Sequence, residues 1–285
     1  ELPPVPSFVD LWTPSGKYAK ADTALSAVIN PGDTTISNAS ISLTLNGEAI
    51  ASDVASADGV ITVTASGAAA LAKGVKYELV LTYTDSVAGE QTQSRKFEVP
   101  VYFEDFDSVE LGPNVDEGVA NAAAWTDTPP TGWTVDDSGV PGVDDPATDG
   151  VTEWAGWSYA NAEWWITTAG DQNRSKFTKA TGNAAVADGD EWDDAAHAEG
   201  KMSALMSTPE ISIAGAEAQM LQLSFDSSWR PYAEQTALIT ASYDGADAVE
   251  VLRWESSAES EFYKSDDSAH WNETITVALD NPEGA

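Results

Sequence analysis

The sequence contains no cysteine, only two histidines, and 13 lysine and arginine residues among 285. The absence of cysteine excludes a disulfide framework, a zinc–thiolate site and a cysteine nucleophile. With 47 acidic residues the formal net charge is −34, and such a chain repels nucleic-acid phosphates and anionic lipids. No apolar run approaches the ~18 residues that a membrane span requires. We therefore expect no nucleic-acid partner and no membrane insertion.

Motifs for catalysis are also scarce. His197 and His270 both lie in polar, loop-like surroundings, and the sequence contains no Gly-x-Ser-x-Gly elbow, His-Glu-x-x-His helix or glycine-rich phosphate loop. So many acidic residues always supply a candidate carboxylate pair for glycoside hydrolysis, but surface carboxylates are usually just solvated. We therefore expect this chain not to be an enzyme, although a longer parent chain could carry a catalytic domain.

The start of the chain and its acidic surface bear on location. The sequence opens at Glu1-Leu2-Pro3-Pro4 without an initiator methionine, which predicts a processed or excised part of a larger protein. A surface rich in aspartate and poor in lysine suits salty or calcium-rich surroundings, where counterions screen self-repulsion. We expect an extracellular or cell-surface location, with other domains elsewhere in the parent chain.

Charge and tryptophan content change near residue 100. Residues 1–100 hold 6 basic and 11 acidic side chains, a net of −5, whereas residues 101–285 hold 7 and 36, a net of −29. Trp12 is the only tryptophan of the first part, and ten lie in the second. Together with Pro100, this shift predicts two domains, 1–100 and 101–285.

The first domain alternates short apolar runs with turn signals such as Asn46-Gly47. The expected strands are 24–29, 40–45, 60–65, 77–83 and 95–99. Seven or so strands in about 80 residues, with no helical period, predict a β-sandwich. The runs Ser40-Ile41-Ser42-Leu43-Thr44-Leu45 and Leu79-Val80-Leu81-Thr82-Tyr83 resemble bacterial immunoglobulin-like repeats of secreted proteins. The resemblance implies an immunoglobulin-like spacer domain.

The second domain is also predicted to be all-β, with long acidic loops between its strands. The expected strands are 101–106, 164–168, 184–187, 221–225, 237–243, 248–254 and 273–279. The loop from about 129 to 156 has no periodicity, and a loop of this length is unusual unless it is functional or held by an ion.

Three motifs follow one another in the second domain. They are Phe103-Glu104-Asp105-Phe106-Asp107, Pro130-Thr131-Gly132-Trp133 and Leu205-Met206-Ser207-Thr208-Pro209. In this order they resemble the cleaved-adhesin or choice-of-anchor J modules of secreted bacterial proteins. The resemblance covers residues 102–285 and implies a jelly-roll β-sandwich. It also implies a closing strand after 273–279 that this sequence lacks, so we expect an unpaired edge near 103–106.

Calcium is the expected cofactor, because it takes six to eight oxygen ligands and suits acidic loops of extracellular β-domains. The resemblance implies a structural Ca²⁺ site at Glu104 and Asp107, with Asp226 and an acid from the 136–149 loop as further ligands. The run 188–199 matches an EF-hand only superficially, since its strict glycine position holds Asp193. That run is either another kind of calcium loop or a solvated acidic loop.

Tryptophan supplies the candidate ligand-binding residues. Trp154, Trp157, Trp164 and Trp165 form the densest cluster in the sequence. Exposed indole faces stack on flat, weakly polar surfaces such as sugar rings, and strand alternation would turn one member of the Trp164–Trp165 pair outward. These four residues predict a carbohydrate platform. The alternative is that most of them fill the core or cover its loops.

The sequence as a whole predicts a non-catalytic extracellular binding or adhesion module, stabilised by calcium, whose partner is a glycan or a surface protein. Two alternatives remain open. One is an accessory region of a secreted hydrolase, such as a phosphoesterase or a polysaccharide-degrading enzyme, whose catalytic domain lies outside this chain. The other is a structural subunit of a surface layer or filament.

Overall fold

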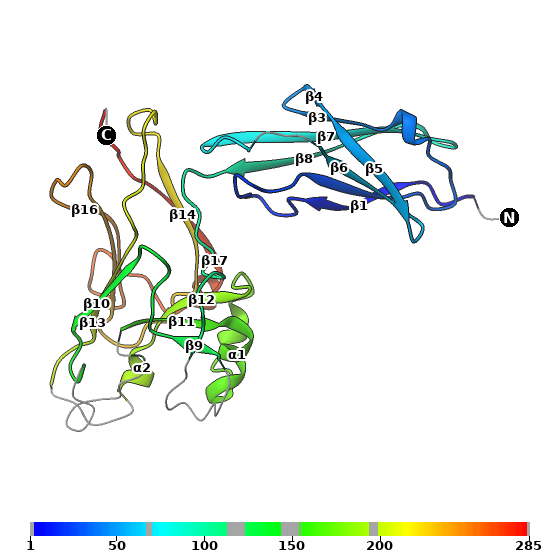
Figure 1. Cartoon of the computed structure of the whole chain (residues 1–285). Helices are drawn as coiled ribbons and strands as arrows, with labels where there is room; N and C mark the ends of the chain where they lie inside the picture. The colour runs from blue at the N-terminus through cyan, green and yellow to red at the C-terminus, as the bar shows by residue number, and fades with distance from the viewer. Residues whose placement is uncertain are drawn as a thin grey trace. The chain divides into compact units, whose positions relative to one another are not determined.

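The computed structural model describes residues 3–66, 70–112, 123–143, 154, 156–193 and 199–283. These residues form β-strands in several antiparallel sheets, with only two short α-helices, so the predicted all-β fold class is confirmed. The chain divides into two compact units, Glu1–Phe103 and Glu104–Ala285, which we take in turn (Figure 1).

The first unit contains two four-stranded antiparallel sheets. One has the strand order β1-β2-β6-β5 and the other β4-β3-β7-β8. The strands are β1 (Phe8–Thr13), β2 (Ser26–Asn30), β3 (Ser42–Leu45), β4 (Glu48–Ile50), β5 (Ser52–Ala57), β6 (Val60–Ala65), β7 (Val75–Asp85) and β8 (Gly89–Val99).

The two sheets share one apolar core. Successive side chains of a strand point to opposite faces, and β7 shows this clearly, because Leu79, Leu81 and Tyr83 are buried while the residues between them are not. Ile29 of β2 and Val63 of β6 belong to the same cluster from the other sheet. Full burial of such side chains stabilises the fold by about 1.5–3 kcal/mol each.

A buried carboxylate connects separate segments of this unit. Asp85, at the end of β7, is only 1% exposed and accepts five hydrogen bonds. They come from the backbone N–H and hydroxyl of Ser7, the hydroxyl of Thr34, and the backbone N–H groups of Val87 and Ala88. The Ser7 hydroxyl is the largest cause that lowers the pKa of Asp85. Asp85 thereby joins three separate segments of the chain.

The second unit consists of smaller sheets with the orders β12-β11-β9, β10-β13, β14-β17 and β15-β16. Its strands are β9 (Trp125–Thr126), β10 (Thr134–Gly139), β11 (Trp157–Asn161), β12 (Asn183–Ala187), β13 (Ser203–Ser207), β14 (Gln222–Ser227), β15 (Thr236–Ala241), β16 (Val249–Glu255) and β17 (Glu273–Ala278). Its α-helices are α1 (Ala162–Thr167) and α2 (Gly189–Trp192). The 3-10 helices of the whole described chain are η1 (Asn38–Ser40), η2 (Thr168–Gly170), η3 (Arg174–Lys176) and η4 (Ser268–His270).

Two of the strands expected in this unit are wrong. Residues 101–106 form no strand, because Phe106 has a left-handed backbone and its N–H donates to the carboxylate of Glu104, which makes a turn. The expected edge strand at 103–106 is therefore not formed. Residues 164–168 lie mostly in α1, since the side chain of Asn161 accepts the N–H of Trp164 and caps a helix there.

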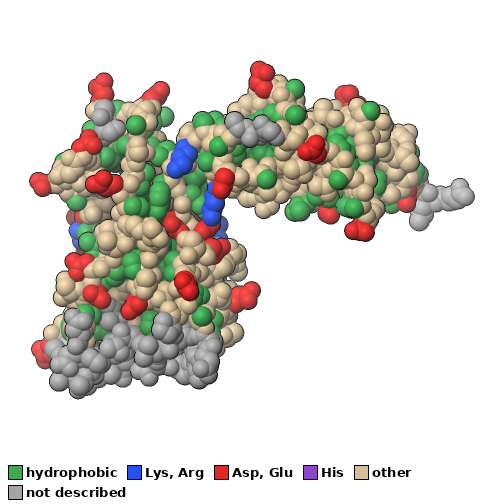
Figure 2. Space-filling model, in the orientation of Figure 1, with side chains coloured by type: hydrophobic (Ala, Val, Ile, Leu, Met, Phe, Trp, Pro, Cys, Tyr) green, Lys and Arg blue, Asp and Glu red, His purple; other side chains and the backbone are tan. Residues whose placement is uncertain are grey.

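Figure 2 shows acidic side chains spread over the visible face of the second unit, with few basic ones among them. That distribution follows from the net charge of −29 carried by residues 101–285. Within the described residues, no helix has both the length and the apolar character needed to cross a membrane.

Candidate functional site

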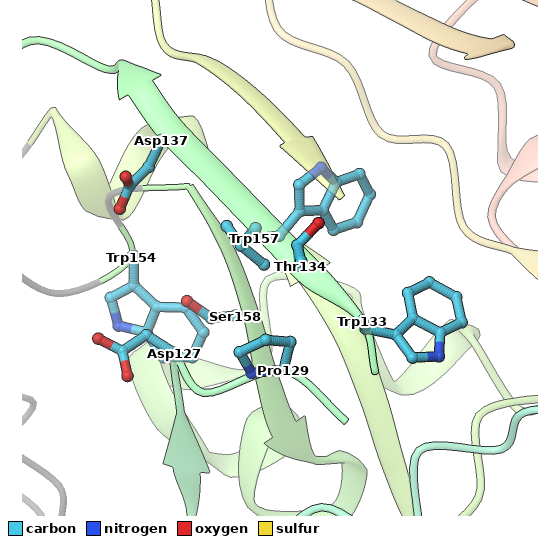
Figure 3. A pocket seen from close by; sticks show the side chains of 9 residues that line it. Asp127, Pro129, Trp133, Thr134, Asp137, Trp154, Trp157 and Ser158 are labelled. Carbon is cyan, nitrogen blue, oxygen red and sulfur yellow. The ribbon is translucent and has the colours of Figure 1, made fainter. Parts of the chain in front are cut away.

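The second unit contains a pocket of about 340 Å³ that is bounded by β10, β11 and the segment after β9. Figure 3 shows its lining side chains, which include three indoles and two carboxylates, with Asp127 next to Trp154. The lining residues are Asp127, Pro129, Trp133, Thr134, Val135, Asp137, Trp154, Trp157 and Ser158.

A tight turn and a bulge shape the β10 wall. Trp133 N–H donates to the carbonyl of Pro130 at 2.9 Å, and Gly132 between them has a φ of 86° that favours glycine. Between Asp136 and Gly139 the pairing of β10 with β13 gains one residue. Such a bulge re-aims the side chains around it. Asp137, within the bulge, points into the pocket (Figure 3).

The β11 wall is the central strand of its sheet and pairs on both sides. Trp157 pairs with Ala187 of β12, and two residues later Tyr159 pairs with Thr126 of β9. The preceding Gly156 has a φ of 138°, and a Cβ there would lie 3.2 Å from the Cβ of Asp137. The absence of a side chain at this position lets the Asp137 strand approach the start of β11 closely.

A cluster of tryptophans lies behind the pocket. Trp154 is only 1% exposed, and its ring centroid lies 4.8 Å from that of Trp125 and 4.8 Å from that of Trp165. Trp164 stacks nearly parallel to Trp154 at 6.3 Å. Of the four predicted platform residues, Trp154 and Trp157 line the pocket, whereas Trp164 and Trp165 pack in this cluster and do not line it.

The indole nitrogen of Trp154 is a buried donor at the pocket wall. Its Nε1 atom has no hydrogen-bond partner within the described part of the chain. A buried donor without an acceptor costs about 1–3 kcal/mol. In Figure 3 the nitrogen-bearing side of this ring lies toward Asp127.

The two pocket carboxylates, Asp127 and Asp137, have no hydrogen-bond donor among the described residues. Asp127 is exposed and Asp137 is half-buried, and no described residue donates a hydrogen bond to either carboxylate or pairs with it. The neighbouring Asp136 differs, because its carboxylate accepts from the hydroxyl and N–H of Ser138. The Ser138 hydroxyl is the main cause that lowers the pKa of Asp136.

A buried ion cluster supports the tryptophans from the other side. The guanidinium of Arg174 lies 3.6 Å from the ring centroid of Trp165 and donates to Glu191 at 2.9 Å and to Asp188 at 3.4 Å. The Arg174 side chain is 4% exposed, and burial is the main cause that raises the pKa of Asp188. Asp188 and Glu191 of the acidic run 188–199 thus have an arginine partner, while residues 194–198, including His197, lie outside the described residues.

The three predicted calcium ligands have other partners. Glu104 caps the turn at Phe106, and Asp107 accepts the N–H of Asn183 at 2.8 Å and packs so closely on Gly182 that a Cβ there would clash. Asp226 accepts from Thr274 at 2.6 Å and lies 3.8 Å from the amine of Lys179. Among the described residues, no three acidic or histidine side chains form a group that could hold a metal ion. Calcium binding stays a prediction.

The Phe103–Asp107 motif has a packing role near the pocket. The Phe106 ring lies 5.6 Å from that of Trp133 and 5.4 Å from that of Tyr159. Burial, with a smaller contribution from the charge of Glu104, raises the pKa of Tyr159 to about 12. Its neutral hydroxyl contacts the sulfur of Met206 on β13 at 3.2 Å. The motif thus stabilises the Trp133 side of the pocket.

Several lining residues were not predicted as ligand-binding residues. They are Asp127, Pro129, Trp133, Thr134, Val135, Asp137 and Ser158. Two signals pointed toward them: the Pro130–Trp133 motif, and the acidic loop 136–149, whose acids were expected to bind calcium and which includes Asp137. Asp127 and Ser158 had no sequence signal, because only the pairing of β9 with β11 brings them together.

Comparisons with known proteins add little to this description. No known protein family matches the sequence, and no curated protein matches it. Three solved chains match. One is the crystal structure of CopC from Methylosinus trichosporium OB3b, at 18% identity and a TM-score of 0.26, which covers 33% of this chain and 93% of that one. The pocket therefore has to be interpreted from its own residues.

Proposed function

We propose that the second unit is a non-catalytic glycan-binding module of an extracellular or cell-surface protein, with the first unit as its spacer. The observation that supports this proposal is the pocket, which combines indole faces with hydroxyl groups and with carboxylates that no described residue pairs with. A saccharide needs this combination, because its rings present C–H faces that pack on indoles and hydroxyl groups that donate to carboxylates.

The size of the pocket limits what it can hold. Its volume of about 340 Å³ lies near the lower end of the ~300–1,000 Å³ typical of small-molecule sites. We propose that it takes the end or a short stretch of a saccharide chain, with Trp157 and Trp133 as the packing surfaces. Trp154 is too deeply buried to serve as an open stacking face, so its contribution is the wall behind the sugar.

The test is direct binding by the full chain. A glycan array identifies candidate saccharides, and calorimetry then measures the affinity of the best one. Trp157→Ala should weaken that affinity at least ~10-fold, since an aromatic contact of this kind contributes on the order of 1 kcal/mol beyond the area it buries. Trp271→Ala is the matched control, because Trp271 lies beside η4 and does not line the pocket.

Two results would count against this proposal: no glycan bound by the full chain, or equal affinity for Trp157→Ala and the unmodified chain. An adhesion module and an accessory region of a secreted hydrolase would both use such a pocket, and the sequence of the parent chain separates them. Structural calcium is a separate proposal that the pocket does not require.

A further inference from the structure

The second unit repeatedly holds a basic side chain between an aromatic ring and a carboxylate. In three such places the charged group lies 3.6, 3.6 and 5.5 Å from the ring centroid. The corresponding nitrogen–oxygen distances are 2.9, 2.5 and 2.7 Å. The three sets are Arg174 with Trp165 and Glu191, Lys264 with Trp254 and Glu273, and Arg253 with Phe262 and Glu250.

The physical basis of these sets is the same each time. The ring face carries negative electrostatic potential and attracts a cation, and the carboxylate adds a charge-assisted hydrogen bond. At Arg174 and Lys264 the cation is also largely withdrawn from water, which strengthens both interactions. Within this unit, the pairing of an aromatic ring with a carboxylate therefore marks a place that suits a cation.

The described lining of the pocket offers the same two kinds of group. Trp157 and Trp133 supply indoles, and Asp127 and Asp137 supply carboxylates that no described residue pairs with. No lysine or arginine occurs among the described residues that line it.

We infer that the pocket selects saccharides that carry a free primary amine, with the ammonium group between a pocket carboxylate and an indole face. This inference rests on the proposed glycan binding and deepens it, because it names the charge and the functional group of the ligand. An amino sugar supplies such a cation together with a ring that packs on an indole face.

The charge of the unit favours the same class of ligand. Residues 101–285 carry a formal charge of −29, which attracts cationic ligands and repels anionic ones over about a Debye length. That general attraction would bring a cationic saccharide to any acidic surface. Selection by the pocket must therefore be separated from attraction by the surface, and the chain offers two adjacent residues that do so.

The experiment compares two oligosaccharides that differ only at the nitrogen. The full chain is titrated calorimetrically with a short glucosamine oligomer and with its N-acetylated counterpart of equal length, at pH 6, where the amine is charged. We expect the free amine to bind at least ~10-fold more tightly. An oligomer of uronic acid, which is anionic, should not bind.

The variants separate the pocket from the surface charge. Asp137→Asn should bring the two affinities to within ~3-fold of each other, because it removes one pocket carboxylate. Asp136→Asn makes the same change one residue away, where the carboxylate bonds to Ser138 and does not line the pocket, and should keep the preference. Circular dichroism of both variants checks that they fold alike.

Amine selection and glycan binding would be contradicted by different results. If the N-acetylated oligomer binds as tightly as the free amine and Trp157→Ala abolishes both, glycan binding holds and amine selection is overturned. If both Asp→Asn variants lower the affinity for the free amine equally, surface charge explains the preference and the inference is again overturned. If neither oligomer binds and a glycan array is also negative, the proposed function itself fails.

Discussion

The two units differ in what their interiors are made of. The first has one continuous apolar core to which strands of both sheets contribute alternate side chains. The second is divided into small sheets, and its described interior is a tryptophan cluster beside a buried ion cluster. The first unit buries its apolar side chains in that core, whereas the second has a pocket lined by indoles and carboxylates.

The two units also differ in how they stabilise a buried carboxylate. In the first unit the buried carboxylate of Asp85 has five donors and stabilises the fold. In the second unit Asp188 and Glu191 share a single arginine, and a buried ion pair stabilises a fold only while every partner is present. Removal of one member of the buried ion cluster should therefore destabilise the second unit more than removal of one member of an exposed ion pair on the same unit.

The largest effect is expected for Arg174→Met. Removal of the guanidinium leaves two largely buried carboxylates without their cationic partner, which should destabilise the second unit by about 3–5 kcal/mol. Scanning calorimetry should show the transition of the second unit at a lower temperature and that of the first unit unchanged. Lys201→Met is the control, because its pair with Glu234 is exposed and contributes at most ~1 kcal/mol. Equal shifts for the two variants would contradict this account of the ion cluster.

A core substitution tests the other half of the comparison. Leu81 on β7 is completely buried, so Leu81→Ala should lower the free energy of unfolding of the first unit by about 2–5 kcal/mol. The transition of the second unit should not move. Thr82→Ala, the outward-facing neighbour on the same strand, should change stability by less than ~1 kcal/mol. A joint shift of both transitions would mean that the two units do not unfold independently.

The smallest effect is a pH dependence in the first unit. The pKa of Asp85 is lower in the folded chain than in the unfolded chain, mainly because of the Ser7 hydroxyl. Its stabilising contribution is therefore present above about pH 4, the ordinary range of an aspartate, and is lost as the pH falls below it. Urea unfolding between pH 7 and pH 3 should show this loss for the unmodified chain. Asp85→Asn should be less stable at pH 7 and flatter with pH, and an unchanged acid slope in this variant would contradict the assignment.

The sequence predicted the first unit better than the second, for a physical reason. Alternation of apolar and polar residues determines which face of a strand is buried, and it located β6 at residues 60–65. In the second unit the same reasoning found the strands β14 to β17 near their observed bounds. It failed at 164–168, where the polar side chain of Asn161 caps a helix, because a local cap overrides a weak strand pattern in so short a segment.

The candidate site was predicted only in part. Trp154 and Trp157 were singled out by tryptophan density, and both line the pocket. Trp164 and Trp165 had the same signal but pack behind it, since composition does not determine which indoles face solvent. Asp127 and Asp137 are ten residues apart in a chain with 47 acidic residues, so only the folded structure shows that they line one pocket.

The most direct test of glycan binding in the second unit observes the indole N–H resonances of the 11 tryptophans during titration of the full chain with the saccharide that it binds best. The account predicts shifts concentrated at Trp133, Trp154 and Trp157, with no shift at Trp12 of the first unit or at Trp271, which does not line the pocket. Assignment by single Trp→Phe variants identifies each signal. Shifts confined to Trp271 or spread evenly over all indoles, with Trp157 no more affected than Trp12, would contradict the claim that this pocket is the binding site.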